Sequence, residues 1–324
     1  MIGLHCRSFP FAACMASGMS GGSLRVRAVR FPHRRNNRLI APLSWAHHMP
    51  KKPPGRCIFC NDTGLSDEHL LPNKWMRRIF QRGASDLRKY RTKAGTIKDR
   101  TLFEPTRLEN IIGGSIFSIT LHVVCKTRCN NGWMHNLEDQ TGPLLIQLIR
   151  GNPGTLTTSG QNLLAKWLVK TTMVAEYIEP DDVTFTSEQR RRMMETLEIP
   201  DGCQIWLGTT TGQRWRNAIE HVSGHGITEL RRASGPHSPP AALGDAQVTF
   251  FGLNTFLAIV FSSSKGAVIR FNFQGEWITG LKQIWPLANP NISLPGFAMR
   301  DEEVDAAFRW FESILFPSGL HVPL

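Results

Sequence analysis

The sequence lacks several features that would place it in a common class of protein. No apolar run is long enough to cross a bilayer, because the longest, Phe250–Phe261, is interrupted by Asn254 and Thr255. There is no internal repeat, no Walker phosphate-binding loop and no dinucleotide-binding glycine motif. We therefore expect neither a membrane-spanning protein nor one of the familiar nucleotide-binding enzymes.

The first 50 residues contain no acidic side chain, although they carry seven arginines. They mix arginine with glycine, serine and proline without a sustained hydrophobic period, which predicts a disordered basic tail. Three interpretations stay open: an arm that adds contacts to DNA, an arginine-rich organellar presequence, or a translation start at Met49. We favour the third, which would place the first cysteine motif almost at the amino terminus.

The remainder of the 324-residue chain has room for two domains and a sizeable core. Hydrophobic residues make up 41% of the sequence and the mean hydropathy is −0.21, which is typical of a soluble globular protein. The turn signal Gly151-Asn152-Pro153-Gly154 marks the best boundary. We expect a tail over residues 1–50, a module over 51–150, and a separate α+β domain of unknown role over 151–324.

The net charge of +12 is spread unevenly along the chain. Residues 1–50 carry +7, residues 51–150 carry 17 basic and nine acidic residues (+8), and residues 151–324 carry 14 basic and 17 acidic residues (−3). Neutralised phosphates supply most of the non-specific affinity of proteins for DNA. The distribution therefore favours DNA as a partner of the first half; the alternative is a solvated basic face.

Four of the seven cysteines form two close pairs, Cys57 with Cys60 and Cys125 with Cys129. Four thiolates suit a tetrahedral structural Zn²⁺ that has no open position for chemistry. The alternative, a disulfide framework, is typical of small secreted chains. Three residues separate the second pair where a zinc knuckle normally has two, so the extra residue either widens the turn or weakens the site. The remaining cysteines are unpaired, a usage typical of a reducing compartment, so we expect a cytoplasmic protein.

Glu68 and His69 lie between the two cysteine pairs and are followed by Pro72. A carboxylate that holds a divalent cation and an imidazole that takes a proton from water are two roles that phosphodiester hydrolysis needs. Asn130, directly after the fourth cysteine, would add a second oxygen ligand to Mg²⁺ or Mn²⁺. Taken alone, the Asp67-Glu68-His69 run is more typical of a surface segment that caps a helix than of a catalytic site.

Taken together, these blocks resemble the HNH endonuclease family. They are most similar to its zinc-knuckle branch, whose pattern reads Cys-x-x-Cys, Glu-His-x-x-Pro-x-x-Trp, then Cys-x-x-Cys-Asn-Asn-x-Trp, four more residues and Glu. The resemblance covers about residues 55–150, and the matching residues are Cys57, Cys60, Glu68, His69, Pro72, Trp75, Cys125, Cys129, Asn130, Asn131, Trp133, Leu137 and Glu138.

The resemblance implies a fold, an activity and a set of site residues. The fold would be a β-hairpin and a helix around a catalytic metal (the ββα-metal arrangement), laid on a treble-clef zinc knuckle. His69 would be the general base, Glu68 and Asn130 would hold the catalytic Mg²⁺ or Mn²⁺, and the four cysteines would hold Zn²⁺.

The sequence departs from the family pattern at three points. Glu68 stands where Asp is commoner, and Asn130 stands where the final histidine is usual. The middle asparagine, which orients the base, has no evident counterpart: Asn110 is distant, and Thr120 and His122 are nearer candidates. These departures bear on turnover more than on the fold.

Hydrophobic periodicity predicts the elements on either side of the boundary. Helices are expected over 74–80, 131–149 (with a kink at Pro143), 162–178, 187–197 (with Ser187 as N-cap) and 301–315. A basic hairpin or loop is expected over 82–107 and a β-rich run over 116–124. Strands of a mainly antiparallel sheet are expected over 204–207, 215–221, 227–231, 247–251, 255–261 and 267–273. His221, His225 and His237 lack ligand spacing and are interpreted as surface histidines.

The leading hypothesis is a metal-dependent HNH-type endonuclease that hydrolyses phosphodiester bonds in DNA. The first alternative is a zinc-stabilised nucleic-acid-binding module whose catalytic residues have decayed. The second is a protein-interaction domain built on a zinc knuckle.

Overall fold

The computed structural model describes most of the chain beyond the basic tail. The described residues are 55–72, 90–98, 102–112, 116–180, 183–227, 244–265 and 279–315, with the single positions 74, 76, 79 and 271. The predictions for residues 1–50, for His237 and for a strand over 267–273 lie outside them, as do most of the expected strand 227–231 and part of the helix over 74–80.

A mixed but mainly antiparallel sheet of eight strands is the largest element. Seven strands follow the order β10-β6-β9-β8-β7-β2-β3, and β12 pairs with β6. Among the described strands, only the β2–β7 and β12–β6 pairs are parallel. The strands are β2 (Tyr90–Lys98), β3 (Leu102–Ile112), β6 (Gln204–Thr210), β7 (Asn217–Ile227), β8 (Gly244–Leu253), β9 (Phe256–Ser263), β10 (Lys282–Trp285) and β12 (Ala298–Met299).

Two small antiparallel sheets and a set of helices complete the described chain. One small sheet pairs β1 with β4 and the other pairs β5 with β11. The strands are β1 (Leu65–His69), β4 (Thr120–Cys125), β5 (Gly154–Thr157) and β11 (Asn291–Leu294). The helices are α2 (His135–Ile149), α3 (Thr158–Ala175), α4 (Ser187–Thr196) and α5 (Asp301–Leu315), with short helical turns η1 (Ile116–Ser118), η2 (Lys126–Met134) and η3 (Glu176–Ile178). The predicted α+β class is confirmed.

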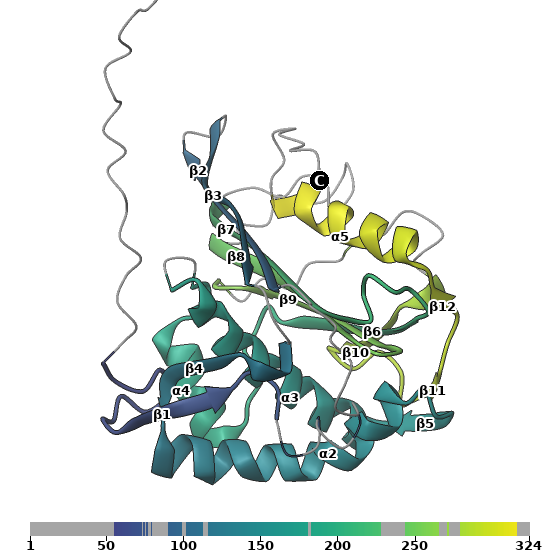
Figure 1. Cartoon of the computed structure of the whole chain (residues 1–324), viewed down its shortest axis with the longest axis horizontal. Helices are drawn as coiled ribbons and strands as arrows, with labels where there is room; N and C mark the ends of the chain where they lie inside the picture. Colours follow the sequence, from purple (N-terminus) through teal and green to yellow (C-terminus); the bar gives the residue numbers. More distant parts are fainter. Residues whose placement is uncertain are drawn as a thin grey trace, which may run out of the picture. The chain divides into compact units, whose positions relative to one another are not determined.

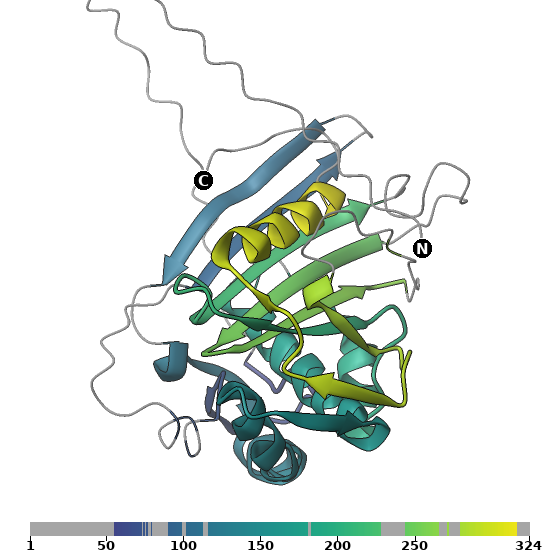
Figure 2. The same cartoon turned by 90° about the vertical axis from the view of Figure 1, so that its right-hand side faces the viewer.

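The large sheet lies between two layers (Figure 1). Helix α5 lies across one face (Figure 2), where Phe308 and Phe311 pack against Trp215 and Phe250. Helices α2, α3 and α4 and the two-stranded β1–β4 sheet lie on the other side. Helix α3 contributes the buried Trp167 to the core that they share. No helix among the described residues is long and apolar enough to cross a membrane.

The two expected domains are not separate in the structure, which corrects the predicted boundary at Gly151–Gly154. The described residues on both sides of that turn belong to one compact unit. A single hydrophobic cluster runs from Cys57 and Leu70 through α2 and α3 to Phe251 and Val260 in the sheet. The helices on either side of the turn bury their apolar sides in that cluster, so the turn changes the direction of the chain without ending a core.

The basic segment predicted as a hairpin or loop over 82–107 contains a hairpin that joins the large sheet. Strands β2 and β3 pair antiparallel, and β2 then pairs parallel with β7 over Tyr90–Thr96. Local periodicity does not predict this pairing, because β2 and β7 are more than a hundred residues apart in sequence.

The predicted helices are largely confirmed, with one correction at a cap. The expected helix over 301–315 is α5, and the expected helix over 162–178 is α3 continued by η3. The N-cap of α4 is Thr186 and not Ser187: its hydroxyl accepts from the Gln189 amide, and the Gln189 side chain accepts from the Thr186 amide. This reciprocal capping box satisfies two amide donors at the start of the helix.

One histidine expected on the surface is buried. His221 in β7 is 2% exposed, and its Nδ1 lies 2.8 Å from the hydroxyl of Thr249 on β8. Both faces of the central strands are covered, so strand position and not polarity decides burial here. His225, four residues further on, is only partly exposed and lies 3.5 Å from Asp245.

A buried ion pair ties α4 to the end of α3 and yields a first prediction. Glu176 accepts from the amides of Thr184 and Phe185 and from the Arg190 guanidinium at 2.8 Å, and both charged side chains are buried. Arg190→Met should lower the free energy of unfolding by about 3–5 kcal/mol, because it leaves a buried carboxylate without its cation. Urea denaturation measures this.

The matched control for that prediction lies on the same helix. Arg192 forms an exposed ion pair with Glu198, so Arg192→Met should change the urea midpoint very little. Equal effects of the two substitutions would contradict the role given to the buried pair.

Candidate metal centre

The first cysteine pair lies in a tight turn that is fixed by backbone hydrogen bonds. The Cys57 amide donates to Asp62 O at 2.8 Å, and the Asn61 amide donates to Cys57 O at 2.9 Å. Asn61 and Gly64 adopt positive φ of 62° and 77°, which residues without a bulky Cβ accept most readily. The Ile58 amide donates to Val123 O, so the turn is held against β4.

The second cysteine pair lies at the end of strand β4, which pairs with β1, and at the start of a wide turn. Cys125 is the last residue of β4, paired in register with Leu65, and Cys129 lies within the π-helical segment η2. A π-helical turn holds one more residue than an α-helical one. The structure thus accommodates the third residue between Cys125 and Cys129 as a wider turn. Gly132 then breaks the helical geometry before α2 begins.

The four thiols converge as the sequence predicts for a metal site. All four sulfur atoms lie within 4.8 Å of one another, with Cys57 Sγ 3.6 Å from Cys129 Sγ and Cys60 Sγ 3.4 Å from Cys125 Sγ. Tetrahedral Zn–S bonds of about 2.3 Å require sulfur atoms ~3.8 Å apart, and covalent disulfides require about 2.05 Å. The arrangement therefore fits a four-coordinate ion such as Zn²⁺ better than a pair of disulfides.

The crowded thiols perturb one another's acidity. The hydrogen bond between Cys57 and Cys129 lowers the pKa of Cys57 to about 4, and the same contact raises the pKa of Cys129 above its ordinary value. Burial raises the pKa of Cys60 to about 12. A cation would replace these shared protons and hold all four sulfurs as thiolates.

The cluster packs directly against the rest of the protein. Phe59 and Trp133, one from each cysteine turn, meet edge to face with centroids 5.1 Å apart. Cys129 Sγ lies 3.8 Å from Met194 Sδ on α4. A cavity of about 550 Å³ separates the first turn from α4, and Arg128, Tyr177 and Glu188 contribute to its walls. The cluster therefore contacts α4 directly through Cys129, beside this cavity.

Glu68, the predicted carboxylate ligand of the catalytic cation, is buried on β1. It is 6% exposed, and among the described residues its carboxylate accepts no hydrogen bond and forms no ion pair. Burial raises the pKa of Glu68 to about 7; the nearby Lys170 ammonium opposes that shift and the Glu138 carboxylate adds to it. Burial of a carboxylate is costly, so a cation bound at this position would be stabilised.

Lys170 and Glu138 are parts of this site that the predicted catalytic set lacks. The Lys170 ammonium, on α3, lies 2.6 Å from Glu138 Oε1 on α2, and the lysine side chain is 1% exposed. One signal was present in the sequence: Lys170 is spaced i+3 from Trp167 and i−4 from Val174, on the apolar side of the expected helix. A charge at a core position requires a buried counter-ion.

The remaining predicted catalytic residues lie on the same hairpin and turn. His69 ends β1, is half-buried, and is opposite Thr120 on β4. The Asn130 amide donates to Ser66 Oγ at 3.0 Å, and Ser66 is two residues before Glu68 on β1. His122 lies 3.1 Å from Asp67 on an exposed part of the hairpin. Of the two nearer candidates for orienting the base, Thr120 is therefore the one opposite His69.

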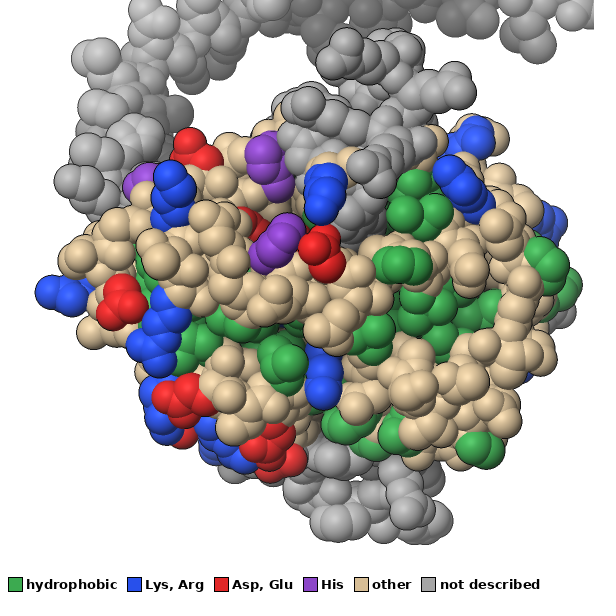
Figure 3. All heavy atoms as spheres, turned by 90° about the horizontal axis from the view of Figure 1, so that it is seen from below, with side chains coloured by type: hydrophobic (Ala, Val, Ile, Leu, Met, Phe, Trp, Pro, Cys, Tyr) green, Lys and Arg blue, Asp and Glu red, His purple; other side chains and the backbone are tan. Residues whose placement is uncertain are grey.

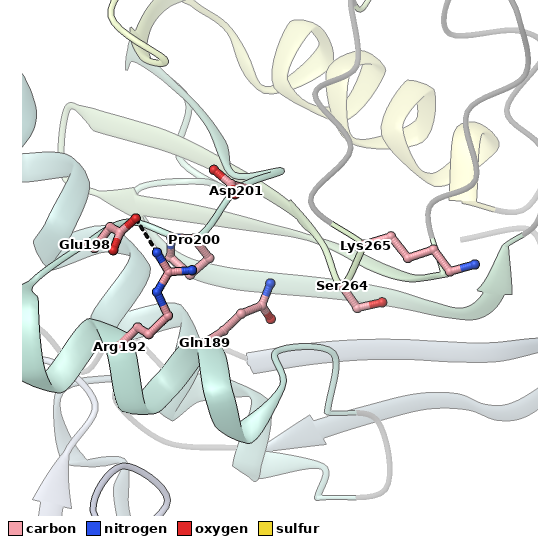
Figure 4. A pocket seen from close by; sticks show the side chains of 7 residues that line it. All are labelled: Gln189, Arg192, Glu198, Pro200, Asp201, Ser264 and Lys265. Carbon is pink, nitrogen blue, oxygen red and sulfur yellow. Dashed lines mark hydrogen bonds and ion pairs between the residues drawn. The ribbon is translucent and has the colours of Figure 1, made fainter.

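A second cavity, of about 210 Å³, lies between α4 and the end of β9 (Figure 4). Arg192 is turned towards Glu198, to which it is ion-paired, and the Lys265 side chain extends away from Gln189 and Asp201. Its polar groups do not converge on a common point, so this cavity offers no evident reaction site.

The predicted basic interface for DNA falls largely on side chains outside the described residues, including Arg77, Arg78 and the lysines and arginines of β2. On the face opposite α5, below the sheet in Figure 1, acidic and basic side chains are interspersed and an apolar band runs between them (Figure 3). The described surface on that side carries no field of a single sign.

Comparison of the chain with family models, with curated proteins and with solved structures finds no match in any of the three.

Proposed function

We propose that this protein is a metal-dependent endonuclease of the HNH type that hydrolyses phosphodiester bonds in DNA. The observation that carries the proposal is the buried Glu68, which makes no hydrogen bond or ion pair with a described residue and is followed at once by His69. Both lie on β1, which pairs with β4 in a two-stranded sheet beside the four-cysteine cluster, and β4 is followed by η2 and α2. The proposal rests on this arrangement and on the sequence pattern.

The donor set around Glu68 fits a hard divalent cation. Mg²⁺ and Mn²⁺ prefer carboxylate and amide oxygens and retain several waters. Glu68 would supply the carboxylate, and Asn130 would supply the amide oxygen, because its amide nitrogen already donates to Ser66. A cation bound there would polarise a phosphate and stabilise the charge that develops on it.

His69 would serve as the general base. Its place after Glu68 at the end of β1 leaves it half-buried, so its imidazole is both held by the hairpin and reachable from solvent. Neutral imidazole accepts a proton near pH 7, which suits the removal of a proton from an attacking water. Zn²⁺ on the four cysteines would fix the hairpin and take no part in the reaction.

The proposed substrate follows from charge, and the proposed compartment from the thiols. Residues 51–150 carry a net charge of +8, which favours a polyanion close to the site. Four clustered thiols persist as zinc ligands in a reducing environment, so we place the protein in the cytoplasm.

Metal-dependent nicking of supercoiled plasmid tests the proposal. Zinc-replete protein, freed of other divalent ions, should be inactive and should nick the plasmid once Mg²⁺ or Mn²⁺ is added. Glu195→Gln, which removes an exposed carboxylate on α4, should behave like the parent. Nicking in the absence of any added metal, or none with either metal, would contradict the proposal.

A second candidate function is favoured by the surroundings of Glu68. Lys170 places a buried ammonium close to the carboxylate, and a permanent cation there would weaken a divalent site. The protein would then be a zinc-stabilised module that binds nucleic acid without cleaving it. Salt-sensitive DNA binding that is unchanged by Glu68→Gln, without nicking under any metal condition, would support this second function.

A further inference from the structure

Three ionisable groups from three elements interact electrostatically at the candidate cation site. Glu68 is on β1, Glu138 on α2 and Lys170 on α3, and each is largely buried. Two carboxylates and one ammonium leave the group one negative charge in excess when all three are ionised. An excess charge in a buried place is costly unless a further cation joins it.

The Lys170 ammonium forms a hydrogen-bonded ion pair with one of the two carboxylates, that of Glu138. Lys170 Nζ lies 2.6 Å from Glu138 Oε1, whereas no ion pair joins it to Glu68 among the described residues. The ammonium also lies over the Trp167 ring, 6.0 Å from its centroid. Because the lysine is 1% exposed, its charge has no access to water and must remain near a carboxylate.

We propose that Glu138 is a positioning residue that holds the Lys170 ammonium away from Glu68 and so leaves the Glu68 carboxylate available to a divalent cation. The inference rests on the proposed function, because the cation is the one that Glu68 would hold there. It also gives α3, from the second half of the chain, a part in the site. Loss of the Glu138 charge would release Lys170 to neutralise Glu68.

The proposal differs in a measurable way from the simpler idea that Glu138 is itself a ligand. If Glu138 acts by restraining Lys170, removal of both charges restores a free Glu68 and hence the cation site. If Glu138 is a ligand, removal of Lys170 as well does not replace the lost oxygen. A double variant therefore separates positioning from direct binding.

The experiment measures Mn²⁺ binding to zinc-replete protein by electron paramagnetic resonance, with Glu68→Gln defining the background. Glu138→Gln should weaken Mn²⁺ binding at least about tenfold, within the range for residues that support a metal ligand. Glu138→Gln combined with Lys170→Met should return to within about threefold of the parent. Lys170→Met alone should bind Mn²⁺ at least as tightly as the parent, because it removes a competing cation.

Zinc content and circular dichroism accompany each variant, so that a folding defect is not mistaken for lost binding. If Glu138→Gln does not fold, Glu138→Asp withdraws the carboxylate from Lys170 by one methylene and should show the same loss. The double variant buries no unpaired lysine, and replacing a buried ion pair by neutral groups is often tolerated.

The Mn²⁺ affinities of the variants decide between these possibilities. Unchanged Mn²⁺ affinity in folded Glu138→Gln overturns the inference, and so does a double variant that stays as weak as the single one. A parent that binds no more Mn²⁺ than Glu68→Gln overturns both the cation site and the inference. Mn²⁺ binding with the expected variant pattern, but without plasmid nicking, supports the inference and removes only the nuclease activity.

Discussion

Cys129→Ser should release the structural metal and lower the free energy of unfolding on the order of 5 kcal/mol. Structural zinc contributes roughly 10–16 kcal/mol of apparent binding free energy to small zinc-dependent folds, and losing one of four ligands forfeits a large part of that. Here the effect should spread beyond the knuckle, because Cys129 is fully buried and its sulfur touches Met194 on α4. Metal analysis and urea denaturation measure the two quantities.

Cys203→Ala is the matched control for this substitution. Cys203 is also a buried free thiol, but it lies outside the cluster. It should retain the zinc content of the parent and lose only about 1 kcal/mol. A parent that contains no metal, together with a Cys129→Ser variant that unfolds at the same urea concentration, would refute the zinc centre.

Cleavage should fall at least about a hundredfold in His69→Ala, the lower end of what a positioned general base contributes. Glu68→Gln should reduce it at least as much, since the neutral amide keeps the shape of the side chain but cannot supply the anionic ligand. Neither variant should lose zinc, because both side chains lie outside the sulfur cluster. Initial rates of plasmid nicking at saturating Mn²⁺, with zinc content measured alongside, provide the test.

His135→Ala is the control for the histidine variant. His135 is exposed at the start of α2 and pairs with Asp139. Its loss should leave the nicking rate within about twofold of the parent, as expected for a surface change away from the site. Persistent cleavage by His69→Ala at the parental rate would show that another group removes the proton.

The parts of the structure that could be predicted from the sequence are those that depend on patterns of neighbouring residues. Helix α5 has the predicted bounds because apolar residues recur at helical spacing and acidic residues begin it. The convergence of the four cysteines could be predicted because two thiol pairs at short spacing suit one shared metal ion. Strands β8 and β9 follow from runs of β-branched and aromatic residues.

The parts that escaped prediction depend on contacts between distant segments. The burial of His221 depends on layers packing on both faces of the sheet, which no window around the residue reveals. Lys170 has a polar character that predicts exposure, and only the arrival of Glu138 from another helix makes its burial tolerable. The positions of Glu68 and Asn130 relative to each other depend on the β1–β4 register and its bulge.

The parallel pairing of β2 with β7 means that truncated fragments of the protein would lose part of the large sheet. Strands β2 and β3 lie between the two halves of the cysteine motif in sequence, yet they extend a sheet built from the other end of the chain. A fragment that ends near Arg150 would contain β2 and β3 but would lack β7, the strand with which β2 pairs. The complementary fragment would uncover one edge of β7, a surface prone to aggregate. Residues 55–150 should therefore not fold when they are moved alone into another protein. Expression of fragments should keep residues 55–315 together.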